Sequence, residues 1–125
     1  MTVFHHVSIQ VSNLGRGKAF YGPLLEVLGM RPFGGYPDAV AYGEDTSSFW
    51  IAAPKSKAVI GGGHVCFAAP TRALVDEFCR VASDHGGAIE EPPKESFNQV
   101  FQRFYYTGLV RDPDGNRVEA ATFAS

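Results

Sequence analysis

Apolar and polar residues alternate near the start of the chain and again near its middle. In the segment 4–11, every second residue from Val7 is apolar, and in the segment 63–68 the same alternation follows His64. Alternation with a period of two predicts β-strands with one face on a core and one polar face. The polar positions of the first of these strands are His6, Ser8 and Gln10.

Each of these strands is followed by apolar residues at helical spacing. Ser12 and Asn13 offer capping oxygens to a first helix, and Thr71 offers one to a second helix that stops at Gly86-Gly87. Gly22-Pro23 lies inside the first helical pattern, which is expected to end at Gly29. Because proline removes a helix hydrogen bond, the sequence predicts a kink or two short helices there.

Short strands separated by turn residues complete each half. Three are expected between residues 30 and 53, with turns at Gly34-Gly35 and at 44–46. Three more are expected at 88–91, 104–110 and 117–123, with a loop at Pro92-Pro93 and a turn at 112–116. The loop from Glu90 to Gln102 is a candidate cover for the pocket.

The order β-α-β-β-β therefore occurs twice, which predicts an α+β fold made of two βαβββ modules. We expect a single domain over 1–125, with modules at 1–54 and 63–125 joined by a linker at 55–62. With helices on the outer face of each sheet, the inner faces would form an open β-cup.

Composition narrows the class of protein. Apolar residues make up 45% of the 125 residues and charged residues 19%, as in ordinary globular proteins. A net charge of -2 and the lack of basic clusters argue against nucleic-acid binding. No apolar run reaches the roughly 20 residues that span a bilayer. Cys66 and Cys79 form no C-x-x-C pair, so we expect buried thiols in a cytoplasmic protein.

Three polar residues among apolar neighbours are candidate metal ligands: His6, His64 and Glu119. If their neighbours face the core, strand alternation puts all three on the concave face. Two imidazoles and one carboxylate suit a divalent Fe, Mn, Zn, Ni or Co ion and leave positions open for water or substrate. From pattern alone, hydrogen-bonded structural histidines and a solvated glutamate remain the alternative.

Several segments resemble the glyoxalase/bleomycin-resistance/extradiol-dioxygenase group, the vicinal oxygen chelate superfamily. They are HVSIQVSNL from His6, AFY at 19–21, LG at 28–29, HVCF from His64, and RDPDGNRVE ending at Glu119. The last is the most specific. The resemblance covers nearly the whole chain and implies one divalent metal ion on His6, His64 and Glu119.

Departures from the family pattern restrict the function. Glyoxalase I enzymes have a fourth ligand, a Glu, where this chain has Trp50. Fosfomycin-modifying members carry a hydroxyl at the place of Ser8, together with positive groups beyond the last strand, where this chain has almost ended. The resemblance implies a metal-dependent lyase or isomerase that acts on a small substrate with vicinal oxygens. A non-catalytic binding protein of the bleomycin-resistance type and an extradiol-type dioxygenase are the alternatives.

Other residues are expected to line the cup. Tyr105 is a candidate general acid or an aromatic wall, and Thr107 faces the same way. Trp50 would form an apolar wall, while Gln10 and Arg117 would hold polar or anionic substrate groups. The family resemblance also implies a homodimer, in which His6 comes from one chain and His64 and Glu119 from the other.

Overall fold

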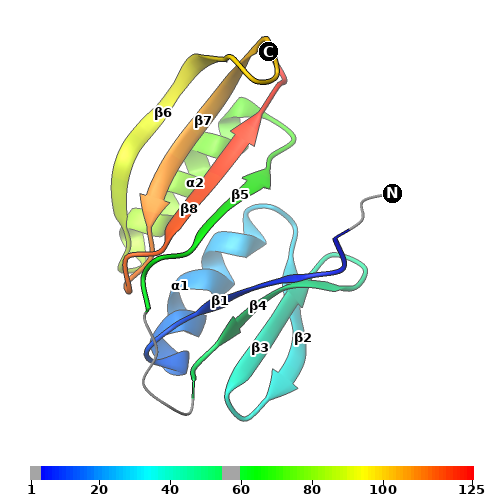
Figure 1. Ribbon diagram of the computed structural model, residues 1–125, viewed down its shortest axis with the longest axis vertical. Helices are drawn as coiled ribbons and strands as arrows, with labels where there is room; N and C mark the ends of the chain where they lie inside the picture. The colour runs from blue at the N-terminus through cyan, green and yellow to red at the C-terminus, as the bar shows by residue number, and fades with distance from the viewer. Residues whose placement is uncertain (1–3, 55–59) are drawn as a thin grey trace.

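The structure, a computed structural model, describes residues 4–54 and 60–125 and consists of two modules with the same element order (Figure 1). The predicted linker at 55–62 lies in part outside the described residues. The first module contains β1 (Val7–Gln10), α1 (Leu14–Glu26), β2 (Arg31–Tyr36), β3 (Ala39–Gly43) and β4 (Ser47–Ala52). The second contains β5 (His64–Ala68), α2 (Arg72–Asp84), β6 (Ala88–Asn98), β7 (Arg103–Arg111) and β8 (Arg117–Thr122).

Each module forms its own four-stranded sheet, and the two sheets have equivalent strand orders. The orders are β1-β4-β3-β2 and β5-β8-β7-β6. In both, the first strand pairs in parallel with the last, and the remaining pairs are antiparallel. The predicted α+β fold with two βαβββ modules is therefore confirmed.

Both helices begin at the predicted capping residues. The Asn13 side chain accepts a hydrogen bond from the Arg16 backbone N–H at 2.8 Å, and Thr71 caps α2 in the same way. Contrary to the expected interruption, α1 is a single helix that contains Pro23. Phe20 and Leu24, one turn apart, are fully buried, and this packing outweighs the lost hydrogen bond.

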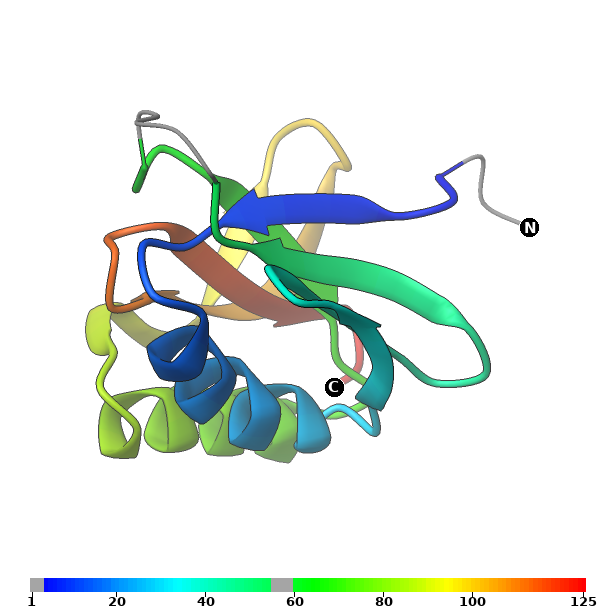
Figure 2. The same cartoon turned by 90° about the horizontal axis from the view of Figure 1, so that it is seen from below.

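One hydrophobic core serves both modules. The two helices pack side by side on one side of the molecule, and the sheets lie on the other (Figure 2). Buried side chains of both helices and both sheets belong to a single cluster, which includes Phe20, Phe49, Phe78, Val110 and Val118. Within the described residues, no helix is long and apolar enough to cross a membrane.

Two strands run through residues that were expected to interrupt them. β2 continues through Gly34-Gly35, and the turn lies after Tyr36. A Cβ at Gly35 would lie 2.1 Å from the Ala39 carbonyl oxygen, so this glycine permits the close approach of β3. β6 contains Pro92-Pro93, which replaces most of the predicted loop with strand. Proline fits there because β6 is an edge strand and its register shifts at this point.

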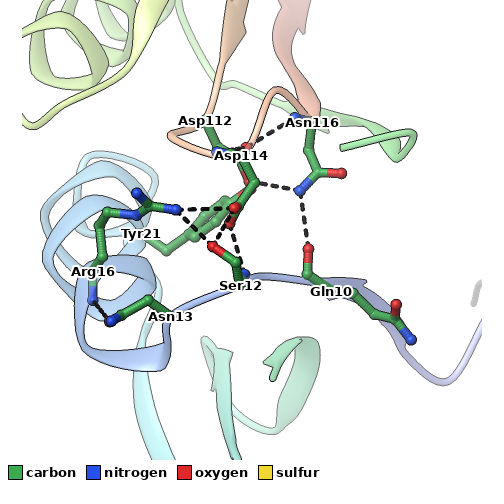
Figure 3. A network of polar contacts seen from close by, with 8 residues as sticks. All are labelled: Gln10, Ser12, Asn13, Arg16, Tyr21, Asp112, Asp114 and Asn116. Atoms are coloured by element: carbon green, nitrogen blue, oxygen red, sulfur yellow. Dashed lines mark hydrogen bonds and ion pairs between the residues drawn. The ribbon is translucent and has the colours of Figure 1, made fainter. Parts of the chain in front are cut away.

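The turn between β7 and β8 ties the second module to the first (Figure 3). Asp112 accepts hydrogen bonds from the Tyr21 hydroxyl at 2.6 Å and from the Asn116 amide at 2.8 Å. Asp114 accepts from the hydroxyl of Ser12, and Arg16 of α1 forms an ion pair with it at 2.9 Å. This polar network, buried at Asp112 and exposed at Arg16, fixes the turn against the end of β1 and the start of α1.

Asn116 is the centre of that network. Its side-chain nitrogen also donates to the Gln10 backbone oxygen at 3.1 Å, and its side-chain oxygen accepts from the Gly63 N–H at 2.9 Å. Gln10 ends β1, Gly63 precedes β5, and Asn116 precedes β8. A single buried amide therefore connects three strands, each of which begins or ends near a predicted metal ligand.

Candidate functional site

Two of the three predicted metal ligands lie together on the uncovered face of the second sheet. His64 begins β5 and Glu119 lies in the middle of β8, the neighbouring parallel strand. Val118 and Ala120, on either side of Glu119, are fully buried, so strand alternation turns Glu119 away from the core. The His64 Nε2 and Glu119 Oε1 atoms are 3.1 Å apart.

The Glu119 carboxylate is held in place by a second partner. The Thr107 hydroxyl on β7 donates a hydrogen bond of 2.6 Å to Oε2, which leaves Oε1 directed at His64. Thr107 was expected on this face, and it is the group that orients the carboxylate. Hydrogen bonds of this kind fix the orientation of metal-binding side chains in proteins.

The geometry of this pair fits a divalent metal ion. Two ligand atoms that are each ~2.1 Å from one ion are separated by about 3.0–3.4 Å at octahedral to tetrahedral angles. The His64–Glu119 separation of 3.1 Å falls in that range. An imidazole nitrogen and a carboxylate oxygen are also suitable donors for the metals considered above.

The third predicted ligand does not join this pair within one chain. His6 immediately precedes β1 on the first sheet, exposed to solvent, and its ring centroid is 6.4 Å from that of Trp50. Its Nδ1 atom lies 2.9 Å from Nδ1 of His5. Over residues 4–54 and 60–125, no group of three or more His, Cys, Asp and Glu side chains could hold a metal ion. One chain therefore brings together two of the three predicted ligands.

The first sheet presents a face of its own that carries the other predicted residues. Ser8 pairs with Trp50 across β1 and β4, which places both side chains on the face away from the helices. The Trp50 ring stacks on Tyr36 at 5.9 Å with an interplanar angle of 19°. A pocket of about 410 Å³ lies here, lined by His6, Ser8, Tyr36 and Trp50 among others. Gln10 is exposed at the end of the strand.

The remaining predicted residues accompany the His64–Glu119 pair. Tyr105 lies on β7, two residues before Thr107, and lines a separate apolar pocket. Arg117 is exposed and forms an ion pair with Glu90, with 3.4 Å between Nε and Oε1. Glu90 also pairs with Arg111 at 2.5 Å. The Arg117 side chain is therefore partly engaged by Glu90, and its backbone pairs with His64 across β5 and β8.

Cys66 differs from the expectation of a buried thiol. It pairs with Glu119 across β5 and β8 and is exposed, whereas Cys79 is buried in α2. Its alternation with His64 gives the physical reason, because residues two apart on a strand share a face. Desolvation and the charge of Glu119 raise the pKa of the Cys66 thiol to about 12.

Two aromatic residues near the site were not identified from the sequence. Phe101 and Phe123 line the same apolar pocket as Tyr105. Phe123 follows Glu119 and Ala121 at intervals of two, and this alternation was a usable signal. Phe101 lies in the turn between β6 and β7, for which the sequence pattern gives no facing direction.

Comparison with known proteins agrees with the fold. A sequence model of the Glyoxalase/Bleomycin resistance protein/Dioxygenase superfamily matches residues 3–120. The chain belongs to this superfamily. No curated protein matched the sequence.

Solved structures of the same superfamily share the fold over almost the full chain. A glyoxalase/bleomycin resistance protein from Albidiferax ferrireducens T118 is 30% identical, with a TM-score of 0.87 over 97% of this chain and 99% of that one. A glyoxalase/bleomycin resistance protein/dioxygenase family enzyme from Burkholderia phytofirmans PsJN is 18% identical, with a TM-score of 0.75 over 98% and 99%. A putative glyoxalase from Bacillus halodurans is 21% identical, with a TM-score of 0.73 over 98% and 96%.

Proposed function

We propose that the protein is a metal-dependent enzyme of glyoxalase-like type, a lyase or isomerase whose small substrate binds the metal through two neighbouring oxygens. The metal ligands are His64 and Glu119 of one chain and His6 of the partner subunit in a homodimer. The observation that carries this proposal is the His64–Glu119 pair, with donor atoms 3.1 Å apart and the carboxylate oriented by Thr107.

The position of His6 supports a shared site. It lies on the uncovered side of the first sheet, while His64 and Glu119 lie on that of the second. Two half-sites of this kind become whole when the first sheet of one chain faces the second sheet of another. A two-fold dimer would form two such sites at once, because each chain gives both halves.

The residues around the pair suit the handling of a developing negative charge. A bound divalent cation would supply positive charge to two adjacent substrate oxygens. Glu119 is the carboxylate of this pair. It can accept a proton from the substrate, with its second oxygen kept in place by Thr107. Tyr105, on the same strand as Thr107, can donate a hydrogen bond or a proton to a substrate oxygen.

Metal content tests the ligand set directly. Protein expressed with Zn, Ni, Mn, Fe or Co is dialysed and its metal is measured by mass spectrometry. We expect about one ion per chain in the wild type and a loss of at least 80% in His64→Ala and Glu119→Gln. His85→Ala is the matched control, because His85 caps the end of α2, where its ring bonds to the Val81 carbonyl oxygen at 2.8 Å. Equal metal content in all four proteins would refute the ligand assignment.

The shared site requires a separate experiment. His6→Ala and Glu119→Gln are each deficient alone, but mixed subunits regain one complete site per heterodimer. We expect the mixture to recover metal binding after refolding together, whereas each variant refolded alone does not. A wild-type protein that sediments as a monomer at micromolar concentration while it retains its metal would exclude the shared site.

A non-catalytic binding protein is the second candidate, and one observation favours it. Trp50 stands where glyoxalase I enzymes carry a fourth ligand, and its ring is stacked on Tyr36 as the wall of a pocket. Such a wall suits the holding of a flat ligand. If a ligand binds the metal-free protein as tightly as the metal-loaded one and is recovered unchanged, the binding function replaces the enzymatic one.

A further inference from the structure

An apolar pocket lies beside the His64–Glu119 pair on the same sheet. It has a volume of about 410 Å³ and is lined by Phe67 and small residues in and next to β5 and β8, and by three further aromatic rings. The rings come from different segments: Phe101 from the turn after β6, Tyr105 from β7, and Phe123 from the chain just after β8. Local sequence alone therefore does not account for their convergence.

The three rings form an organised wall. The Phe101 and Phe123 centroids are 5.8 Å apart with perpendicular planes, and those of Tyr105 and Phe123 are 6.2 Å apart. Asn98 holds the turn that carries Phe101, since its side-chain oxygen accepts hydrogen bonds from the N–H groups of Val100 and Phe101. Yet Phe101 is 60% exposed and Phe123 43%, so apolar area here remains in contact with water.

The pocket adjoins the candidate metal site. Cys66 lines it and is the cross-strand neighbour of Glu119, while Ala121 lines it and is the next residue of β8 on that face. Residues two apart on a strand are separated by ~7 Å. The pocket thus begins one side chain beyond the carboxylate, within the length of a small organic molecule.

The charge of the lining restricts what it can accept. None of the described residues that line the pocket is charged. The guanidinium of Arg103 lies over the Phe123 ring with its central carbon 4.0 Å from the centroid. That contact engages the cation with the ring rather than leaving it as a partner for an anionic group. A volume of about 410 Å³ is near the lower limit for small-molecule pockets.

We propose that this pocket is the subsite for an uncharged aryl or branched alkyl group of the substrate, whose other end carries the two adjacent oxygens. This inference rests on the proposed function, because it assigns the oxygens to the metal side of the site. It names the substrate class: a small molecule with a chelating head and an apolar tail of about one ring, joined by a short spacer.

Two hydroxamates test the subsite, because each offers two adjacent oxygens and they differ only in the tail. Acetohydroxamate carries a methyl group, and 4-phenylbutyrohydroxamate carries a phenyl ring on a three-carbon spacer. Calorimetry on the metal-loaded protein gives both Kd values. We expect the phenyl compound to bind at least tenfold more tightly, and we expect that ratio to fall to threefold or less in Phe123→Ala and in Phe101→Ala.

Phe104→Ala is the matched control. Phe104 is also a highly exposed phenylalanine, but it precedes Tyr105 on β7 and so faces the other side of the sheet. The ratio should stay at its wild-type value in this variant. The proposal is overturned by a wild-type ratio near one, by the same ratio in Phe123→Ala and Phe101→Ala as in the wild type, or by an equal loss in Phe104→Ala.

The design separates failure of the subsite from failure of metal chelation. If His64→Ala and metal removal leave the binding of acetohydroxamate unchanged, chelation is refuted, while the phenyl-to-methyl ratio still reports on the pocket. If Phe123→Ala weakens the dimer in sedimentation and leaves the ratio unchanged, the aromatic patch is covered by the partner subunit, and the subsite is rejected.

Discussion

Replacement of Asn116 by alanine tests whether the turn between β7 and β8 holds the two modules together. The Asn116 side chain is 2% exposed and makes three hydrogen bonds. They join it to the Asp112 carboxylate at 2.8 Å, to the Gln10 carbonyl oxygen at 3.1 Å and to the Gly63 N–H at 2.9 Å. Alanine removes all three and leaves their partners in place.

The expected loss follows from the surroundings of each partner. Asp112 is 4% exposed and charged, so its lost bond costs about 1.5–2 kcal/mol. The bonds to Gly63 and Gln10 are only partly buried, and water can replace part of each, which gives about 0.5–1 kcal/mol apiece. The sum is about 3 kcal/mol, a large fraction of the 5–15 kcal/mol of a typical domain.

Urea unfolding at pH 7, followed by circular dichroism, measures this change. Asn98→Ala is the control, because Asn98 also bonds two backbone groups, but locally and in an exposed turn. We expect a loss of about 3 kcal/mol for Asn116→Ala and of about 0.5 kcal/mol for Asn98→Ala. A loss below 1 kcal/mol in Asn116→Ala, or equal losses in the two variants, would refute the role of the turn.

Three further predictions concern other parts of the molecule. Tyr21→Phe lowers the free energy of unfolding by about 1–2 kcal/mol at pH 7, because it removes the hydrogen bond to Asp112. Burial and a neighbouring carboxylate raise the pKa of Tyr21 in the folded state. The wild type therefore loses stability as the pH rises above ~10, the pKa of tyrosine in the unfolded chain. Urea melts from pH 8 to 11 should show a shallower decline in the variant. Gly87→Ala destabilises by about 1–3 kcal/mol in thermal melts, since its Cβ would lie 2.5 Å from a carbon of the Phe20 ring. Co²⁺ titration quenches the single tryptophan, Trp50, whose ring is 6.4 Å from that of His6, and an equal response in His6→Ala would contradict a role for His6 in metal binding.

The sequence is informative where a pattern depends on neighbours along the chain. Helix caps at Asn13 and Thr71 and the alternation through β8 require only local geometry, and the structure confirms them. Continued through the turn at 112–116 into β7, the alternation also predicts that Thr107 faces the same side as Glu119, and the two side chains are hydrogen-bonded. The same alternation puts Cys66 on the face of His64 and Phe123 on the face of Glu119.

Other features depend on which elements become neighbours in space. Pro92-Pro93 predicts an interruption in an average strand, but β6 is an edge strand and tolerates both prolines. Gly34-Gly35 predicts a turn, yet it serves the close approach of β3. The separation of His6 from His64 depends on how the two modules pack, which no pattern within either module encodes.

The most specific family signature ends at the candidate ligand Glu119; its earlier part, from Asp112 to Asn116, contributes no candidate ligand, and its structure explains why it accompanies one. Asn116 bonds to Gly63 directly before His64, and it stands three residues before Glu119. Its amide therefore fixes how far β5 is advanced relative to β8, and with it the 3.1 Å separation of the His64 and Glu119 side-chain atoms. A slip of one residue in that pairing would turn one of the two side chains into the core. Variants of Asn116 that still fold should thus lose metal before they lose the other features of the sheet, and a folded Asn116→Asp protein with full metal content would contradict this link.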